Sequence, residues 1–229
     1  MEYYTGQFSG EYKGDYYTGP YGKFIVQPLD GVTKHIEGGE FWDELFLKTH
    51  FDQLTKESIV VEAGSHVGFH TVYLAHKCQQ VYAFEPQLIN YDRLVQNCKL
   101  NNITNAICFN VALYNKNCKM AVNNITGQHQ VNYGIYQACS LVMHENKDGD
   151  VEARTLDSFD IPKVDFIKTD CETVDLEVLI GGIETIKRCR PTIIFEDSTR
   201  GSQPRLDFFA PLNYNIVEIA ASNYLATPK

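Results

Sequence analysis

Short apolar runs alternate with helical patterns along most of the chain. The runs at 59–61 and 80–84 are each followed directly by a glutamate, and apolar residues at helical spacing come after each turn. Buried strands that alternate with amphipathic helices are typical of a parallel sheet with both faces covered. The pattern therefore predicts an α/β fold.

The same pattern predicts where the elements lie. The expected strands span residues 59–62, 80–84, 106–111, 164–170 and 192–196. The expected helices span 40–54 and 69–77, with one more around Leu94, Val95 and Cys98 and one around Leu176, Leu179, Ile180 and Ile183. Two apolar runs at 214–219 and 224–227 are separated by a short turn, so we expect an antiparallel hairpin at the C-terminus.

Two segments interrupt this regularity. Eight aromatic residues alternate with glycines and charges in residues 1–26. We interpret 1–35 as an aromatic arm or cap, and 36–229 as the main domain. The arm is compatible with a strand pair packed on the main domain, with a lid over a carbohydrate-like acceptor, or with a dimer contact. Residues 114–153 are polar, and they predict an insertion, in the form of a β-hairpin, near the active site.

Composition narrows the class of protein. The chain has 229 residues, 44% of them hydrophobic, and no apolar run approaches the roughly 20 residues that span a bilayer. No basic segment followed by an apolar one marks a signal peptide. Seven scattered cysteines without C-x-x-C spacing predict free thiols rather than disulfides or a zinc site. These features predict a cytoplasmic protein without membrane contact, as a monomer or homodimer.

The formal net charge of the chain is -9, from 20 basic and 29 acidic side chains. This field repels a phosphate backbone, so we expect no nucleic-acid partner. It favours a cationic ligand.

A glycine-rich turn follows the first buried strand. Gly64 and Gly68 are spaced as G-x-x-x-G, and Glu62 lies two positions before the first glycine. This spacing differs from the dinucleotide fingerprint G-x-G-x-x-G, which receives a pyrophosphate at a helix N-terminus. A leading acid suits a cofactor without phosphate and with a positive charge, such as S-adenosylmethionine. A nucleotide-dependent oxidoreductase is a weaker alternative, and a non-catalytic binding module is another.

Acids end four of the predicted strands: Glu62, Glu85, Asp170 and Glu196. The carboxyl ends of parallel strands share one edge of the sheet, where ligands bind. Each acid alone is also explained as a cap of the helix that follows.

The strand ends also suggest how the cofactor is held. Glu85 is placed to bind ribose hydroxyls, Pro86 to lie against the adenine, and Asn110 with the Val111 amide to pair with the adenine edge. The turn amides between Ser65 and Gly68 are expected to hold the methionine carboxylate. The full set of expected cofactor-binding residues is Glu62, Ala63, Gly64, Ser65, His66, Gly68, Phe69, Thr71, Glu85, Pro86, Asn110, Val111, Ala112 and Asp170.

In these motifs the chain resembles the FkbM-type methyltransferases of the class I S-adenosylmethionine-dependent fold. The matching blocks are V-E-A-G-S-H-V-G at 61–68, A-F-E-P at 83–86, N-V-A-L at 110–113, R-T-L-D-S at 154–158, V-D-F-I-K-T-D-C-E at 164–172, R-P-T-I-I-F-E at 190–196 and N-Y-L-A at 223–226. The sequence departs from the usual family pattern at Glu62, at Ser65-His66, at Thr173 and at Asp175. The resemblance implies a doubly wound, mostly parallel seven-stranded sheet with an antiparallel C-terminal hairpin, beside the aromatic-rich N-terminal arm.

The family resemblance implies O-methylation of a hydroxyl on a sugar, glycan or secondary metabolite, with S-adenosylhomocysteine as the other product. A base should take the hydroxyl proton late in the reaction, and Asp170 is the first candidate. Glu172 and Glu196 are the next candidates, and Lys168 lies on the same strand face as Asp170. We expect no metal site, although Asp170 and Glu196 would suit a divalent cation in a metal-assisted variant.

Overall fold

The structure is a computed structural model that describes residues 3–4, 16–19, 21–25, 49–51, 53–121, 144–145, 148–171, 174–197, 203–220 and 222–229. Its central sheet follows the order β1-β6-β5-β4-β11-β12-β14-β13. The strands are β1 (Tyr3–Tyr4), β4 (Ile59–Ala63), β5 (Gln80–Phe84), β6 (Ala106–Phe109), β11 (Phe166–Thr169), β12 (Thr192–Glu196), β13 (Tyr214–Ala220) and β14 (Asn223–Pro228).

Five neighbouring strands, from β6 to β12, run parallel. Strand β14 is antiparallel to β12 and pairs with β13 in the expected C-terminal hairpin. The seven-stranded sheet is thus confirmed, with the two-residue β1 added antiparallel at the β6 edge.

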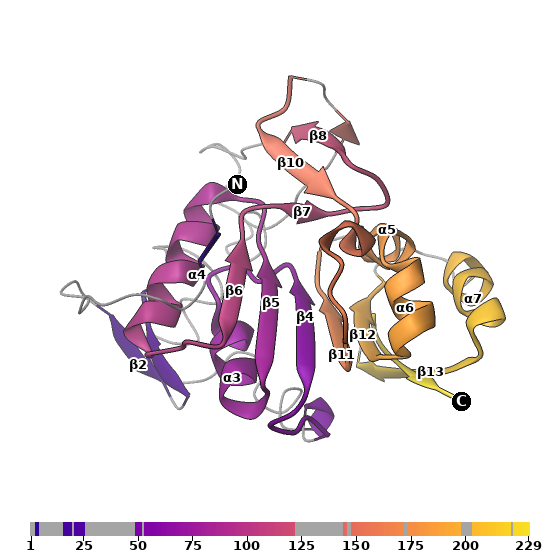
Figure 1. Cartoon of the computed structure of the whole chain (residues 1–229), viewed down its shortest axis with the longest axis horizontal. Helices are drawn as coiled ribbons and strands as arrows, with labels where there is room; N and C mark the ends of the chain where they lie inside the picture. The colour runs from indigo at the N-terminus through magenta and orange to yellow at the C-terminus, as the bar shows by residue number, and fades with distance from the viewer. Residues whose placement is uncertain are drawn as a thin grey trace.

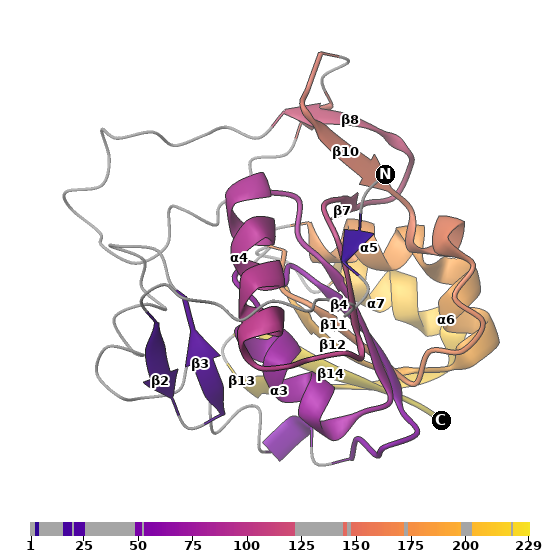
Figure 2. The same cartoon turned by 60° about the vertical axis from the view of Figure 1, so that its left-hand side comes forward.

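Helices cover both faces of this sheet (Figures 1 and 2). One face carries α3 (Phe69–Lys77) and α4 (Leu88–Leu100), and the other carries α5 (Asp175–Gly181), α6 (Ile183–Cys189) and α7 (Gln203–Phe209). Side chains alternate between the two layers along each strand, because successive residues point to opposite faces. Thus Val60 packs on the α3 side and Val61 on the α5 side. Within the ranges described, no helix is long and apolar enough to cross a membrane.

The ends of several elements differ from the expected ones. The third strand stops at Phe109 rather than at 111. Most of the helix expected at 40–54 lies outside the described residues. Residues 49 and 50 are helical, as expected. Phe51 lies in a bend and residues 53 and 54 are not helical, so the predicted end of the helix at 54 was wrong. Helix α7 was not expected from the sequence.

The single helix expected around 176–183 is two helices separated at Gly182. A Cβ at this position would lie 2.9 Å from Cδ2 of Leu156, so glycine permits close packing there. Asp157 then starts α6, because its carboxylate accepts hydrogen bonds from the amides of Glu184 (3.0 Å) and Thr185 (2.8 Å). The aspartate of the R-T-L-D block therefore has a capping role.

A second, four-stranded sheet with the order β7-β10-β8-β9 stands beyond the carboxyl ends of the parallel strands (Figures 1 and 2). Its strands are β7 (Ala112–Leu113), β8 (Cys118–Ala121), β9 (His144–Glu145) and β10 (Val151–Arg154). Strands β8 and β10 pair antiparallel, as the expected hairpin would. Residues 122–143 lie outside the described residues.

The described part of the N-terminal segment contains a hairpin of β2 (Tyr17–Gly19) and β3 (Gly22–Phe24). Its Phe24 ring is buried and stacks on Phe69 with ring centroids 4.2 Å apart. The buried Asn97 side chain accepts from the Ile25 amide (2.6 Å) and donates to the Val67 carbonyl (2.7 Å). This part of the segment is therefore fastened to the α3–α4 layer, and the rest of residues 1–35 is not described apart from Tyr3–Tyr4 and Tyr16.

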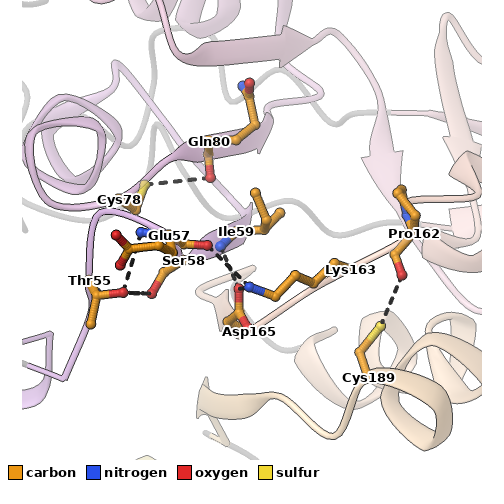
Figure 3. A network of polar contacts seen from close by, with 10 residues as sticks. All are labelled: Thr55, Glu57, Ser58, Ile59, Cys78, Gln80, Pro162, Lys163, Asp165 and Cys189. Atoms are coloured by element: carbon orange, nitrogen blue, oxygen red, sulfur yellow. Dashed lines mark hydrogen bonds and ion pairs between the residues drawn. The ribbon is translucent and has the colours of Figure 1, made fainter.

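The amino ends of the central strands β4 and β11 are held by polar contacts around Asp165 (Figure 3). Its Oδ2 atom accepts from the Ile59 amide at 2.7 Å and pairs with Lys163 Nζ at 2.9 Å. Since Ile59 begins β4 and Asp165 directly precedes β11, this contact helps to fix the register between the two strands.

Candidate active site

The turn after β4 passes very close to the end of β11. Gly64 has a φ of 79°, and a Cβ there would lie 2.0 Å from the Asp170 carbonyl oxygen. Only glycine combines a left-handed backbone with such an approach. The turn therefore brings the carboxyl ends of β4 and β11 into direct contact.

The backbone amides of this turn are largely engaged within the protein. The Gly64 and Ser65 amides donate to the Phe84 carbonyl at 3.0 and 3.1 Å. The His66 amide donates to Glu85 Oε2 at 2.9 Å, and the Gly68 amide donates to the Ser65 carbonyl at 2.8 Å. Three of the amides expected to hold the methionine carboxylate thus already have acceptors, because the turn closes on the end of β5.

His66 adopts a left-handed backbone with a φ of 48°. Histidine and asparagine tolerate this region better than most residues. His66 is therefore compatible with the backbone of this turn.

Strands β4 and β11 align two charged residues on the α3 face. The register pairs the Cα of Lys168 with that of Glu62. Each lies two positions after a residue of the α3-side core, Phe166 and Val60 respectively, so both point to the same face. Asp170 is two positions after Lys168 and directly follows β11. We call Glu62, His70, Lys168 and Asp170 the carboxyl-edge cluster.

Glu62 is fully buried in this cluster. Its Oε2 accepts from Thr71 Oγ1 at 2.5 Å, whereas its Oε1 has no hydrogen-bond partner among the described residues. Burial raises the pKa of Glu62 to about 7, against the opposing effects of Lys168 and Thr71. Thr71, which is among the expected cofactor-binding residues, orients this carboxylate.

Lys168 and Asp170 form an ion pair with unequal exposure. Nζ of Lys168 lies 3.3 Å from Oδ2 of Asp170, and the side chains are 4% and 43% exposed. Burial opposes the charge on each group, but the pairing outweighs it. The pKa of Lys168 is therefore held above its ordinary value and that of Asp170 below. Asp170 is thus an ionised carboxylate that reaches solvent beside a fixed positive charge.

His70, for which the sequence alone indicates no specific role, joins the cluster from the first turn of α3. It is 7% exposed, and its Nε2 atom is buried with no hydrogen-bond partner among the described residues. Burial, together with the nearby Lys168, lowers the pKa of His70 to about 3, so the ring is neutral near pH 7. The sequence signal that could have identified it was its position two residues after Gly68.

Glu85 directly follows β5 and is 4% exposed. Its carboxylate accepts from the amides of His66 and Gln87, both at 2.9 Å. Burial nonetheless raises the pKa of Glu85 to about 7. Nδ2 of Asn110 donates to the carbonyls of Glu85 (2.9 Å) and Pro86 (3.0 Å). These bonds hold together the ends of β5 and β6, and they leave Oδ1 as the Asn110 atom that can accept from an adenine amino group.

The remaining expected site residues occupy different positions. Phe69 is buried against Phe24, and Ala63, Val111 and Ala112 are buried at the same edge of the sheet. Glu196 ends β12 and is half-buried. Glu172 lies outside the described residues.

Asp175, at the start of α5, was noted only as a departure from the family pattern. It is 2% exposed and accepts from the Cys171 amide at 3.2 and 3.3 Å. Burial raises the pKa of Asp175 to about 7. It therefore fixes the backbone directly after Asp170. Across the part of the chain that the structure describes, no group of three or more His, Cys, Asp or Glu side chains could hold a metal ion.

The chain matches a known family of proteins. The model of the methyltransferase FkbM domain matches residues 62–217. The structure of methyltransferase FkbM from Methylobacillus flagellatus superposes with a TM-score of 0.55 at 15% identity, over 79% of this chain and 46% of that one. This chain thus spans less than half the length of that protein.

A precorrin 8W decarboxylase from Methanobacterium thermoautotrophicum superposes with a TM-score of 0.50 at 10% identity, over 82% of this chain and 91% of that one. No curated protein sequence matches the chain. The superpositions show the fold alone. The family model covers more than half of the chain and begins at Glu62 itself. This chain therefore belongs to the FkbM family of S-adenosylmethionine-dependent methyltransferases.

Proposed function

We propose that this methyltransferase acts on oxygen, and that it methylates a hydroxyl group of a sugar, glycan or secondary metabolite. The observation that carries the proposal is the exposure of Asp170. Within the carboxyl-edge cluster, its carboxylate is 43% exposed, whereas Lys168 is 4% exposed at the side chain and Glu62 is fully buried. An acceptor hydroxyl that arrives from solvent therefore meets Asp170 rather than Glu62.

The residues of the site fit the cofactor. S-adenosylmethionine, when bound, supplies an electrophilic methyl group on a sulfonium and carries a zwitterionic amino acid end. Glu62, with its unpaired buried Oε1, suits the ammonium of that end. Glu85 accepts from two amides and from the Asn90 side chain. A carboxylate offers about four acceptor positions, so one remains for a ribose hydroxyl.

Asp170 then has two roles in the proposed reaction. Its carboxylate accepts a hydrogen bond from the acceptor hydroxyl and orients the oxygen toward the methyl group. Bound S-adenosylmethionine would supply the methyl group, and Asp170 would take up the proton that the acceptor hydroxyl loses. The ion pair with Lys168 keeps Asp170 ionised beforehand and makes it a weak base, so the proton would leave late rather than early.

A transfer assay tests this proposal. The protein is incubated with S-adenosylmethionine labelled in its methyl group and with a panel of sugars and hydroxylated metabolites, and products are located by mass spectrometry. We expect label on a hydroxyl oxygen, unchanged by excess chelator. Label on nitrogen or carbon, or no transfer to any member while the cofactor binds, would contradict the hydroxyl acceptor. Loss of activity in chelator would favour a cation held by Asp170 and Glu196.

Cofactor binding should also depend on pH through Glu62. Lys168, Thr71, Asp170 and Ser65 act on this carboxylate, and its pKa is about 7 without ligand. A bound ammonium favours the ionised form, so binding releases a proton and should strengthen as pH rises from about 6 to about 8.

Isothermal titration in buffers of different ionisation enthalpy would count the released protons. Glu62→Gln should bind more weakly and with a flatter pH dependence, the remaining slope arising from Glu85 and Asp175. The same pH slope in wild type and Glu62→Gln would refute the role of Glu62.

A further inference from the structure

The amino acid end of the cofactor needs a donor for its carboxylate, and the turn after β4 offers few. The amides of Ser65, His66 and Gly68 donate to acceptors within the protein. Lys168 donates to Asp170 at 3.3 Å. Of the amides from Ser65 to Gly68, that of Val67 alone has no acceptor among the described residues, so a side-chain donor beside the turn would complete the binding of the carboxylate.

His70 provides such a donor. Its ring is 7% exposed in the first turn of α3, and its Nε2 is buried without a hydrogen-bond partner among the described residues. A buried polar atom without a hydrogen bond lowers the stability of the fold. The unpaired Nε2 of His70 therefore points to a ligand atom that forms the missing hydrogen bond. The position is electrostatically suited to an anion, because α3 begins directly after Gly68 and no acidic residue lies in its first turn.

Two unpaired buried atoms thus lie in the carboxyl-edge cluster: Oε1 of Glu62 and Nε2 of His70. One suits an ammonium, and the other suits a carboxylate when the neutral ring carries its proton on Nε2. We propose that His70 binds the carboxylate of the methionine moiety and, with Glu62, recognises the zwitterionic end of the cofactor. This inference rests on the cofactor and not on the hydroxyl acceptor.

The neutrality of His70 makes the proposal specific. With a pKa of about 3, the ring does not attract the carboxylate by charge near pH 7, so it acts as a neutral donor. The facing titratable groups are Lys168 on β11, Asp170 directly after this strand, and His66 in the turn. Recognition by His70 should therefore be unchanged between about pH 6 and about pH 8, unlike the effect of Glu62.

The test compares two cofactors that differ only in this carboxylate. Full-length protein is titrated calorimetrically with S-adenosylmethionine and with decarboxylated S-adenosylmethionine, which keeps the amine and the sulfonium. His70→Phe keeps a ring of similar size without a donor, and His70→Asn keeps a side-chain donor. His76→Phe, at the exposed end of the same helix, is the matched control.

Wild type and His76→Phe should prefer the carboxylated cofactor roughly 10- to 100-fold, since hydrogen bonds to charged groups are strong. His70→Phe should lose that preference, and His70→Asn should retain part of it. The unliganded His70→Phe protein should unfold at the same or a higher temperature, because no hydrogen bond is lost.

Equal weakening of both cofactors in His70→Phe would overturn the inference, since His70 would then only shape the turn. Unchanged binding of both would overturn it too. If wild type binds neither cofactor, both the cofactor assignment and the inference about His70 fail. If wild type binds both but transfers no methyl to hydroxyls, the proposed function fails while the role of His70 stands.

Discussion

Replacing Asp170 by asparagine is expected to lower kcat roughly 100- to 10,000-fold, the range that general base catalysis contributes. The amide keeps the shape and one acceptor oxygen but cannot take up the hydroxyl proton. Cofactor affinity should change by less than about threefold, because the loss falls on the transition state. Calorimetric binding and single-turnover transfer, measured on the same preparation, would separate the two effects.

The matched control is Asp165→Asn at the other end of the same strand. Asp165 braces the start of β4 through the Ile59 amide (2.7 Å), far from the carboxyl edge. This variant should lose some stability, on the order of 1–3 kcal/mol, while kcat stays unchanged. Equal turnover in Asp170→Asn and wild type would remove Asp170 from the chemistry.

Gly64→Ala is the second change for which we expect a large effect. Its φ of 79° and the 2.0 Å approach of a Cβ to the Asp170 carbonyl make any side chain unfavourable. The left-handed backbone alone costs about 1–2 kcal/mol. The Asp170 carbonyl cannot yield easily, because the Asp170 amide donates to Ala63 (3.1 Å) and the next amide donates to Asp175.

We therefore expect Gly64→Ala to lower the free energy of unfolding by about 3 kcal/mol or more, and to abolish detectable cofactor binding. Thermal and denaturant unfolding would measure the first effect, and calorimetry the second. Gly68→Ala should be milder, because its Cβ meets the end of the flexible Leu94 side chain at 2.7 Å. Gly19→Ala, with its nearest contact at 3.8 Å, should be neutral. Normal cofactor binding by Gly64→Ala would contradict this expectation, because the ends of β4 and β11 could then move apart without loss of the cofactor site.

Local patterns in the sequence were sufficient for much of the fold. The helix Phe69–Lys77 and the strands Gln80–Phe84 and Thr192–Glu196 have the expected ends. Apolar periodicity and turn residues act over a few neighbours, so they can be read without tertiary contacts. The split at Gly182 was missed because it depends on packing against Leu156 and on the Asp157 cap, which come from another part of the chain.

The candidate site divides in the same way. The sequence by itself determined that acids lie at or beside the carboxyl ends of the strands and that a glycine turn follows β4, since both are properties of short segments. Only the tertiary structure decided that Lys168 lies beside Glu62, that the amides of the turn are engaged, and that His70 is buried with an unpaired nitrogen. The physical reason is that strand register, burial and pKa depend on which distant segments meet and on how much water they exclude.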